Sequence, residues 1–142
     1  MIPPDRFRWM VLATLPLLLL LLAGCAKKTH LVKGQVVFDD GTPAKELAGY
    51  YIMFESDDPK ASATGVIAAD GSFTVGTFQE GDGALVGRQR VAISPPPAEV
   101  HKPPLPPAPI AKKYGSFETS LIEVDIQAQT NELTIKVERL KK

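Results

Sequence analysis

The chain has 142 residues, 16 basic and 16 acidic side chains, a formal net charge of zero and one cysteine. This balance, with no basic stripe or Arg-rich arm, argues against nucleic-acid binding. A chain of this length suits one domain. Its single cysteine excludes an intrachain disulfide, so the stability of that domain depends on its hydrophobic core.

The first predicted element is a signal peptide over residues 1–24. Arg6 and Arg8 precede an apolar run of 14 residues, 9–22, and Lys27 follows it. A spanning helix needs about 20 apolar residues, whereas a run of 10–14 is typical of a signal peptide. An uncleaved membrane anchor and a cleaved signal without lipid remain the alternatives.

The end of this run, Leu22-Ala23-Gly24-Cys25, resembles the lipobox of bacterial lipoproteins. The resemblance implies that the leader peptidase recognises Leu22, Ala23 and Gly24 and cuts before Cys25. It also implies that the Cys25 sulfur carries a diacylglycerol and that the new N-terminus is acylated, with palmitate as the expected chain. Burial of acyl chains contributes about 0.8 kcal/mol per CH₂, so three chains would hold the protein at a membrane.

Residues 25–30 are then a short tether between the lipid and the domain. Ala26 stands where lipoproteins retained at the inner membrane tend to have aspartate. The resemblance therefore implies a periplasm-facing protein of the cell envelope, at the outer rather than the inner membrane. Removal of residues 1–24 would leave 118 residues with 14 basic and 15 acidic side chains.

Seven strand-like segments separated by turn signals follow the tether. In the first, Val32, Gly34, Val36 and Phe38 share one face, which is the period-two pattern of a half-buried strand. Asp70-Gly71 between the third and fourth segments is a strong hairpin signal. The segments are residues 31–38, 50–55, 63–68, 73–78, 88–94, 121–127 and 131–137. Without a convincing helix, they predict an all-β fold, a single antiparallel seven-stranded β-sandwich over residues 31–138.

A proline-rich loop at residues 95–109 interrupts this series, with eight prolines in the segment. Such a composition favours polyproline II or irregular surface structure and excludes a packed helix or a central strand. The loop is therefore expected to be mobile and to tolerate shortening.

The motifs at the turns resemble those of carboxypeptidase regulatory-like domains. The resemblance is carried by Gly34-Gln35-Val36, Asp40-Gly41-Thr42-Pro43, Asp70-Gly71-Ser72-Phe73 and the strand from Gly87 to Ile93. It implies a transthyretin-like (prealbumin) sandwich and no uniform activity. The chain also resembles small lipoproteins with one such domain, through Ile110-Ala111-Lys112-Lys113-Tyr114 and Thr119-Ser120-Leu121, with Ala111 in place of the usual proline.

Catalytic residues, a metal site and a cofactor are not predicted. His30 and His101 lie in the tether and in the proline-rich loop, without an acidic partner at fixed geometry. Two pairs of adjacent aspartates and two aspartates beside glycines offer oxygen ligands for calcium, but none has the spacing of an EF-hand loop. They are Asp39, Asp40, Asp57, Asp58, Asp70 and Asp82.

Five aromatic residues could form a sugar-binding platform: Tyr50, Tyr51, Phe54, Phe73 and Phe78. The three phenylalanines are predicted to be core because they lie on strands with apolar neighbours, and one of the two tyrosines should be exposed.

These patterns predict a lipid-anchored, non-enzymatic binding or structural module of the cell envelope. Its partners would be the membrane, through the anchor, and an envelope protein or glycan. A carbohydrate- or calcium-binding accessory domain and an envelope hydrolase remain the alternatives.

Overall fold

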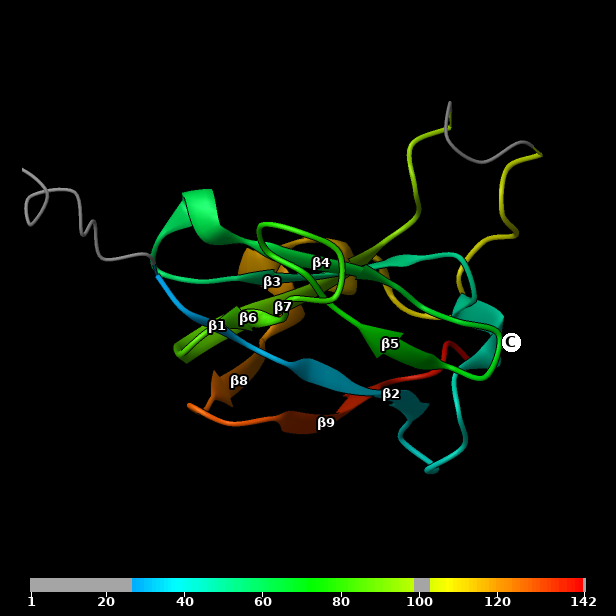
Figure 1. Ribbon diagram of the computed structural model, residues 1–142. Helices are drawn as coiled ribbons and strands as arrows, with labels where there is room; N and C mark the ends of the chain where they lie inside the picture. The colour runs from blue at the N-terminus through cyan, green and yellow to red at the C-terminus, as the bar shows by residue number, and fades with distance from the viewer. Residues whose placement is uncertain (1–26, 99–102, 142) are drawn as a thin grey trace, which may run out of the picture.

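The computed structural model describes residues 27–98 and 103–141, which fold mostly as strands (Figure 1). The strands are β1 (Thr29–His30), β2 (Val32–Phe38), β3 (Tyr51–Glu55), β4 (Ala63–Val66), β5 (Ser72–Thr74), β6 (Ala84–Leu85), β7 (Gly87–Ser94), β8 (Ile122–Ile126) and β9 (Asn131–Val137). The helical pieces are η1 (Lys45–Leu47), η2 (Pro59–Ala61), η3 (Lys112–Gly115) and α2 (Phe117–Ser120). The prediction of an all-β fold is confirmed.

The strands form three sheets, with orders β5-β2-β9, β4-β3-β7-β8 and β1-β6. Each of the seven segments expected from the sequence overlaps one of the longer strands. The described residues nevertheless contain nine strands, because β1 and β6 add a two-residue pair that no local pattern marks.

The expectation of antiparallel pairing throughout is wrong for β2 and β9, which pair in parallel from Val32↔Asn131 to Phe38↔Val137. The reason is that β8 belongs to the other large sheet, so the chain crosses between sheets before β9 begins. Asn131 fixes this crossing, since its Oδ1 accepts a bond from the Gln127 N–H (2.8 Å) and its own N–H donates to the Leu31 carbonyl (2.8 Å).

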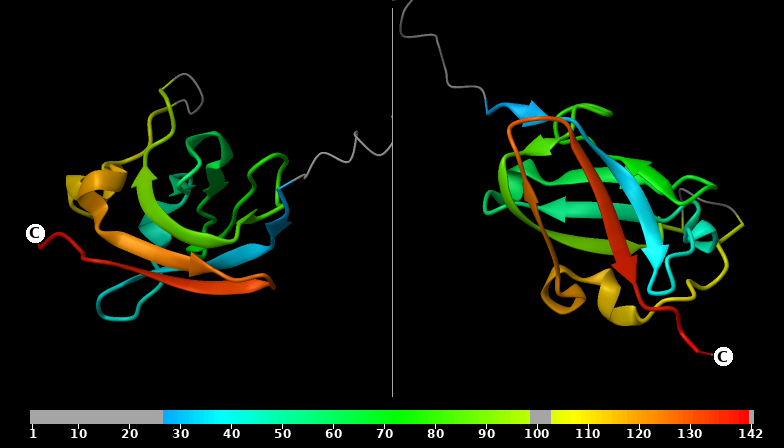
Figure 2. Two further views of the ribbon diagram at one scale, coloured as in Figure 1. Left: turned by 90° about the vertical axis from the view of Figure 1, so that its left-hand side faces the viewer. Right: turned by 90° about the horizontal axis from the view of Figure 1, so that it is seen from below.

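The two larger sheets contribute side chains to one hydrophobic core, and Figure 2 shows them from two further sides. Phe38 of β2 and Phe54 of β3 are fully buried, as is Ile126 of β8. Phe73 of β5 is also buried, with its ring centroid 6.0 Å from that of Phe54. The core positions predicted for Phe54 and Phe73 are therefore confirmed.

The core position predicted for Phe78 is wrong, because its side chain is 61% exposed. β5 ends at Thr74, and the chain then crosses to the other sheet, where Gly76 bridges Thr64. The carboxylate of Asp82 accepts bonds from three successive backbone N–H groups beyond Gly76, including that of Phe78. These bonds form a turn instead of a longer strand, and Phe78 projects from it.

The described end of the proline-rich loop is packed against the domain, contrary to the expected mobility. Leu105 packs against Gly49 and the core, and the Tyr50 hydroxyl donates a hydrogen bond to the Pro106 carbonyl (2.8 Å). Ile110 is buried, and the Leu140 N–H donates to the Pro109 carbonyl (2.7 Å). Apolar anchors among the prolines therefore fix this part of the loop, whereas residues 99–102 lie outside the described part.

Candidate functional site

The residues predicted to direct lipidation, Leu22, Ala23, Gly24 and Cys25, lie outside the described residues, as does His101. Within the part of the chain that is described, no helix is long and apolar enough to cross a membrane. His30 is half-buried in β1 and pairs with Ala84, so the chain joins the domain at Thr29, two residues before the predicted start.

Two aspartates considered for calcium have the same structural task in two matching turns. Asp40 Oδ1 accepts bonds from the N–H (2.8 Å) and hydroxyl (2.6 Å) of Thr42, and Asp70 Oδ1 accepts the same pair from Ser72 (2.9 and 2.6 Å). In each turn the glycine after the aspartate, Gly41 or Gly71, has φ of +85°. The side-chain bonds from Thr42 and Ser72 hold the pKa of each carboxyl below its ordinary value.

Asp58 and Asp82 also bind nearby groups of the chain. Asp58 pairs with Lys27 and accepts the Lys60 N–H (3.1 Å) at the start of η2, and the bond to Lys27 lowers its pKa. Among residues 27–98 and 103–141, no three His, Cys, Asp or Glu side chains are arranged to hold a metal ion. At Asp40, Asp58, Asp70 and Asp82, hydrogen bonds within local turns explain why an aspartate is present.

The five aromatic residues considered for sugar binding do not form a platform. Phe54 and Phe73 are buried, and so is Tyr50, whose hydroxyl is bonded to the proline-rich segment. Tyr51 is half-buried, and Phe78 lies in the turn beyond β5. Stacking on a sugar needs accessible rings on one face, which this arrangement does not provide.

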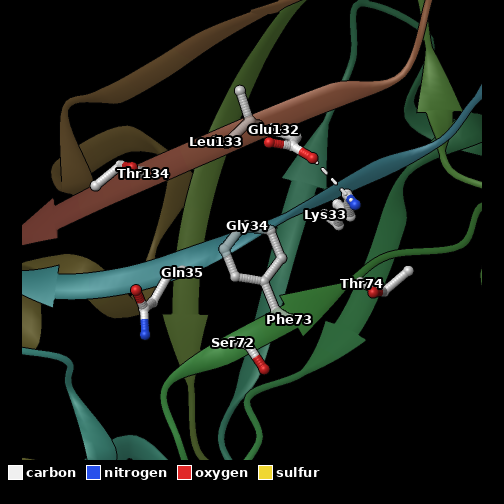
Figure 3. A pocket seen from close by; sticks show the side chains of 9 residues that line it. All are labelled: Lys33, Gly34, Gln35, Ser72, Phe73, Thr74, Glu132, Leu133 and Thr134. Carbon is white, nitrogen blue, oxygen red and sulfur yellow. Dashed lines mark ion pairs between the residues drawn. The ribbon is translucent and has the colours of Figure 1, made fainter.

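Polar side chains cover the outer face of the sheet β5-β2-β9, around a hollow of about 540 Å³ (Figure 3). They come from two rows of register neighbours, Thr74–Lys33–Glu132 and Ser72–Gln35–Thr134. Lys33 Nζ is 3.0 Å from Glu132 Oε1, and the Gln35 amide donates to the Asp70 carbonyl (3.1 Å). We call these six side chains the polar sheet face; they present hydroxyl, amide and charged groups at strand spacing.

An apolar groove of about 590 Å³ lies where the proline-rich segment meets the sheet β4-β3-β7-β8. Its lining residues are Tyr50, Ile93, Pro95, Pro107, Ala108, Ile110, Ala111, Lys112, Gly115 and Leu140, and we call it the end groove. Lys112 is the one charged side chain that lines it, and Leu140 is 51% exposed. A concave, mostly apolar surface with few polar groups is typical of binding sites.

The end groove lies at the opposite end of the domain from β1. β2 runs from the β1 end towards the groove end, and its seven residues span about 20 Å. β1 and the C-terminal end of the chain accordingly lie on opposite sides in Figure 1. Sequence reasoning missed the groove because its walls come from four separate segments; Leu105 and Ile110 among the prolines were the available signal.

The motif residues that carry the family resemblance contact one another. Gly34 of β2 is the register partner of Phe73, and the Val36 N–H donates to the Gly71 carbonyl (2.9 Å). Residues of the second motif, 110–114 and 119–121, also make hydrogen bonds that hold the fold together. The Tyr114 hydroxyl accepts the Glu138 N–H (3.0 Å), and the buried Ser120 hydroxyl donates to the Val91 carbonyl.

Tyr114 therefore joins η3 to the C-terminal segment, and Ser120 joins α2 to β7.

No family model matches the chain, and no curated protein matches it. Among solved structures, it is similar to a DUF3823 family protein from Parabacteroides merdae, with 12% identity, a TM-score of 0.52 and coverage of 80% of this chain and 48% of that one. A second DUF3823 family protein, from Bacteroides ovatus, has 16% identity, a TM-score of 0.45 and coverage of 78% and 45%. The chain thus spans about half the length of these proteins, and the first likeness concerns the fold alone.

Proposed function

We propose that this protein is a lipid-anchored, non-enzymatic binding module of the cell envelope that holds an apolar segment of an envelope protein in the end groove. The observation that carries the proposal is the groove itself, with apolar walls and one lysine at its rim. Its place at the opposite end from β1 supports the proposal, because a chain anchored through Cys25 would present the groove away from the membrane.

The proposed fold family is the transthyretin-like sandwich of carboxypeptidase regulatory-like domains. Seven longer strands in two sheets around one core support it, with the two-residue β1 and β6 as additions. The contact between Gly34 and Phe73 supports it as well, since it joins the two motifs on which the resemblance depends.

The anchor is tested by intact mass spectrometry of the protein extracted from envelopes, together with Cys25→Ser. The expected mass is that of residues 25–142 plus a diacylglyceryl group and one acyl chain. The protein should face the periplasm and be retained with the outer membrane. Cys25→Ser should abolish lipid attachment and release the chain from the membrane fraction. A variant that stays equally processed and membrane-bound would contradict the lipoprotein assignment.

The groove is tested by placing a photo-crosslinking phenylalanine analogue at position 140 or 66 of the anchored protein. Leu140 lines the groove and is 51% exposed, whereas Val66 lies on β4 outside it and is 54% exposed, so the two positions are matched in accessibility. Discrete protein adducts are expected from position 140 alone, and Ala108→Trp, which fills the groove, should remove them. Equal adducts from both positions, or none from position 140, would refute this role.

Glycan binding is the second candidate, favoured by the polar sheet face. Its two rows of polar side chains at strand spacing could bind successive hydroxyl groups of an extended sugar chain. Binding to a glycan array that is lost in Gln35→Ala and kept in Ala108→Trp would favour this candidate over the end groove.

A further inference from the structure

We propose that the β1 end of the domain lies directly on the bilayer surface, with Phe78 and Val86 in the headgroup region. This inference rests on the proposed lipidation of Cys25. It adds a membrane-contacting surface and therefore a fixed orientation of the domain, neither of which the anchor by itself requires.

The first argument is the reach of the chain. Thr29 and His30 pair with Leu85 and Ala84, so the polypeptide is held to the domain from Thr29 onwards. From Cys25 to Thr29 the chain can extend at most about 14 Å, at roughly 3.5 Å per residue. The headgroup layer on one side of a bilayer takes up roughly 6 Å of that reach. A domain anchored in this way stays within about 8 Å of the membrane surface.

The second argument is where exposed apolar side chains occur. Among the described residues, six large hydrophobic side chains are exposed: Leu31, Val66, Phe78, Val86, Leu121 and Leu140. Leu31 and Val86 directly follow the paired strands β1 and β6, and are 39% and 53% exposed. Leu31, Val86 and Phe78 are three of the six exposed side chains, and all three belong to segments next to β1.

The loop that carries Phe78 is fixed against β1. Its residue Gly83 lies so close to the His30 carbonyl that a Cβ at this position would come within 1.8 Å of the oxygen. The Thr77 hydroxyl donates to the Gly83 carbonyl (2.8 Å), which closes the loop. The backbone that carries the exposed Phe78 ring is thus held in place, so little backbone freedom is lost when the ring enters a membrane interface.

Charge at this end is mixed, so the apolar side chains carry the contact. Lys27 and Lys28 share a hollow with Val86, Arg88 and the acidic residues Asp57 and Asp58. Lys27 pairs with Asp58 and Arg88 with Glu123. Lys28 makes no ion pair within the described residues, and a single lysine adds only a weak attraction to an anionic surface.

The sequence supplies the reporter for a direct test. Trp9 is the one tryptophan and lies in the expected leader, so the processed chain would contain none. Phe78→Trp and Leu121→Trp then each give a single-tryptophan protein. Leu121 is the matched control: it is 83% exposed and lies at the opposite end of β8 from Ile126, which pairs with Gly87 beside Val86.

The lipidated full-length products are placed in vesicles of phosphatidylethanolamine and phosphatidylglycerol that contain brominated lipid. Tryptophan at position 78 should be quenched by the brominated lipid and be about threefold less accessible to aqueous acrylamide than tryptophan at position 121. Adding Val86→Ser should reduce the lipid quenching at position 78 without releasing the protein.

The mass spectrum of the same samples separates the two ways in which the test can fail. If the protein carries its lipid and acrylamide quenches both tryptophans equally, the membrane-contact inference is overturned and the anchor stands. If the mass shows no lipid, the proposed function and this inference fall together.

Discussion

Gly34 of β2 lies between its register partners Phe73 of β5 and Leu133 of β9. A Cβ at this position would lie 2.1 Å from the Leu133 carbonyl oxygen and 2.9 Å from the Phe73 ring. The ring thus lies close to the space that a side chain of Gly34 would need, an arrangement known to compensate for a glycine within a strand. Glycine is required here by space, since no positive φ is recorded at Gly34.

Gly34→Ala should therefore lower the free energy of unfolding by about 3 kcal/mol, because either the β2–β9 pairing or the Phe73 ring has to move. Urea denaturation followed by circular dichroism measures the loss. Gly115→Ala is the control, since the nearest atom to a Cβ there is the Ile93 carbonyl oxygen at 3.9 Å. Equal stability losses in the two variants would show that crowding at Gly34 has been overstated.

Whole elements were predictable where one face is buried along the full strand. In β9, Asn131, Ile135 and Val137 are buried while Glu132 and Lys136 are exposed, and this alternation is legible in the sequence. The same holds for the turns, because Asp-Gly followed by Ser or Thr encodes its own side-chain bonds.

Elements defined by distant partners could not be predicted in this way. β1 and β6 are strands only because Thr29–His30 and Ala84–Leu85 pair with each other. The early end of β5 depends on the bridge from Gly76 to Thr64, and the end groove on four separate segments. The proline-rich segment misled for a related reason: composition describes its backbone, whereas Leu105 and Ile110 determine its packing.

Leu105 is the residue that tests whether this segment is docked. Leu105→Ala should destabilise the protein by about 1–2 kcal/mol, since the side chain is only partly buried, and should make the segment more sensitive to proteolysis. Leu121→Ala, which removes an exposed side chain, is the control and should change neither property. If Leu105→Ala behaved like this control, the loop would be mobile after all.

At the scale of the molecule, carboxylates fasten many of the turns that hold the sheets together. Hydrogen bonds from a neighbouring side chain are the main cause of a lowered pKa at five of them: Asp40, Glu46, Asp58, Asp70 and Glu118. Glu46 pairs with Arg139 (2.6 Å), whose guanidinium lies 3.6 Å from the centre of the Phe38 ring. The pair therefore covers one end of the core.

These shifts determine how stability depends on pH. A carboxyl whose pKa is lower in the folded than in the unfolded state stabilises the fold above its unfolded value, and the contribution is lost as pH falls through the folded value. The unfolded values are 3.8 for aspartate and 4.5 for glutamate. Stability from these groups should thus be constant at neutral pH, begin to fall near pH 4.5 and continue to fall below 3.8.

Urea denaturation between pH 7 and pH 3 measures this dependence, and Asp70→Asn is the informative variant. Its side-chain oxygen can still accept the two bonds from Ser72, but the group no longer titrates. The variant should therefore lose less stability than the parent between pH 4.5 and pH 3, while Thr134→Ser on the polar sheet face should follow the parent curve. An unchanged acid slope in Asp70→Asn would mean that the Asp70 turn is as stable with a protonated carboxyl as with a charged one, and that the acid sensitivity arises elsewhere.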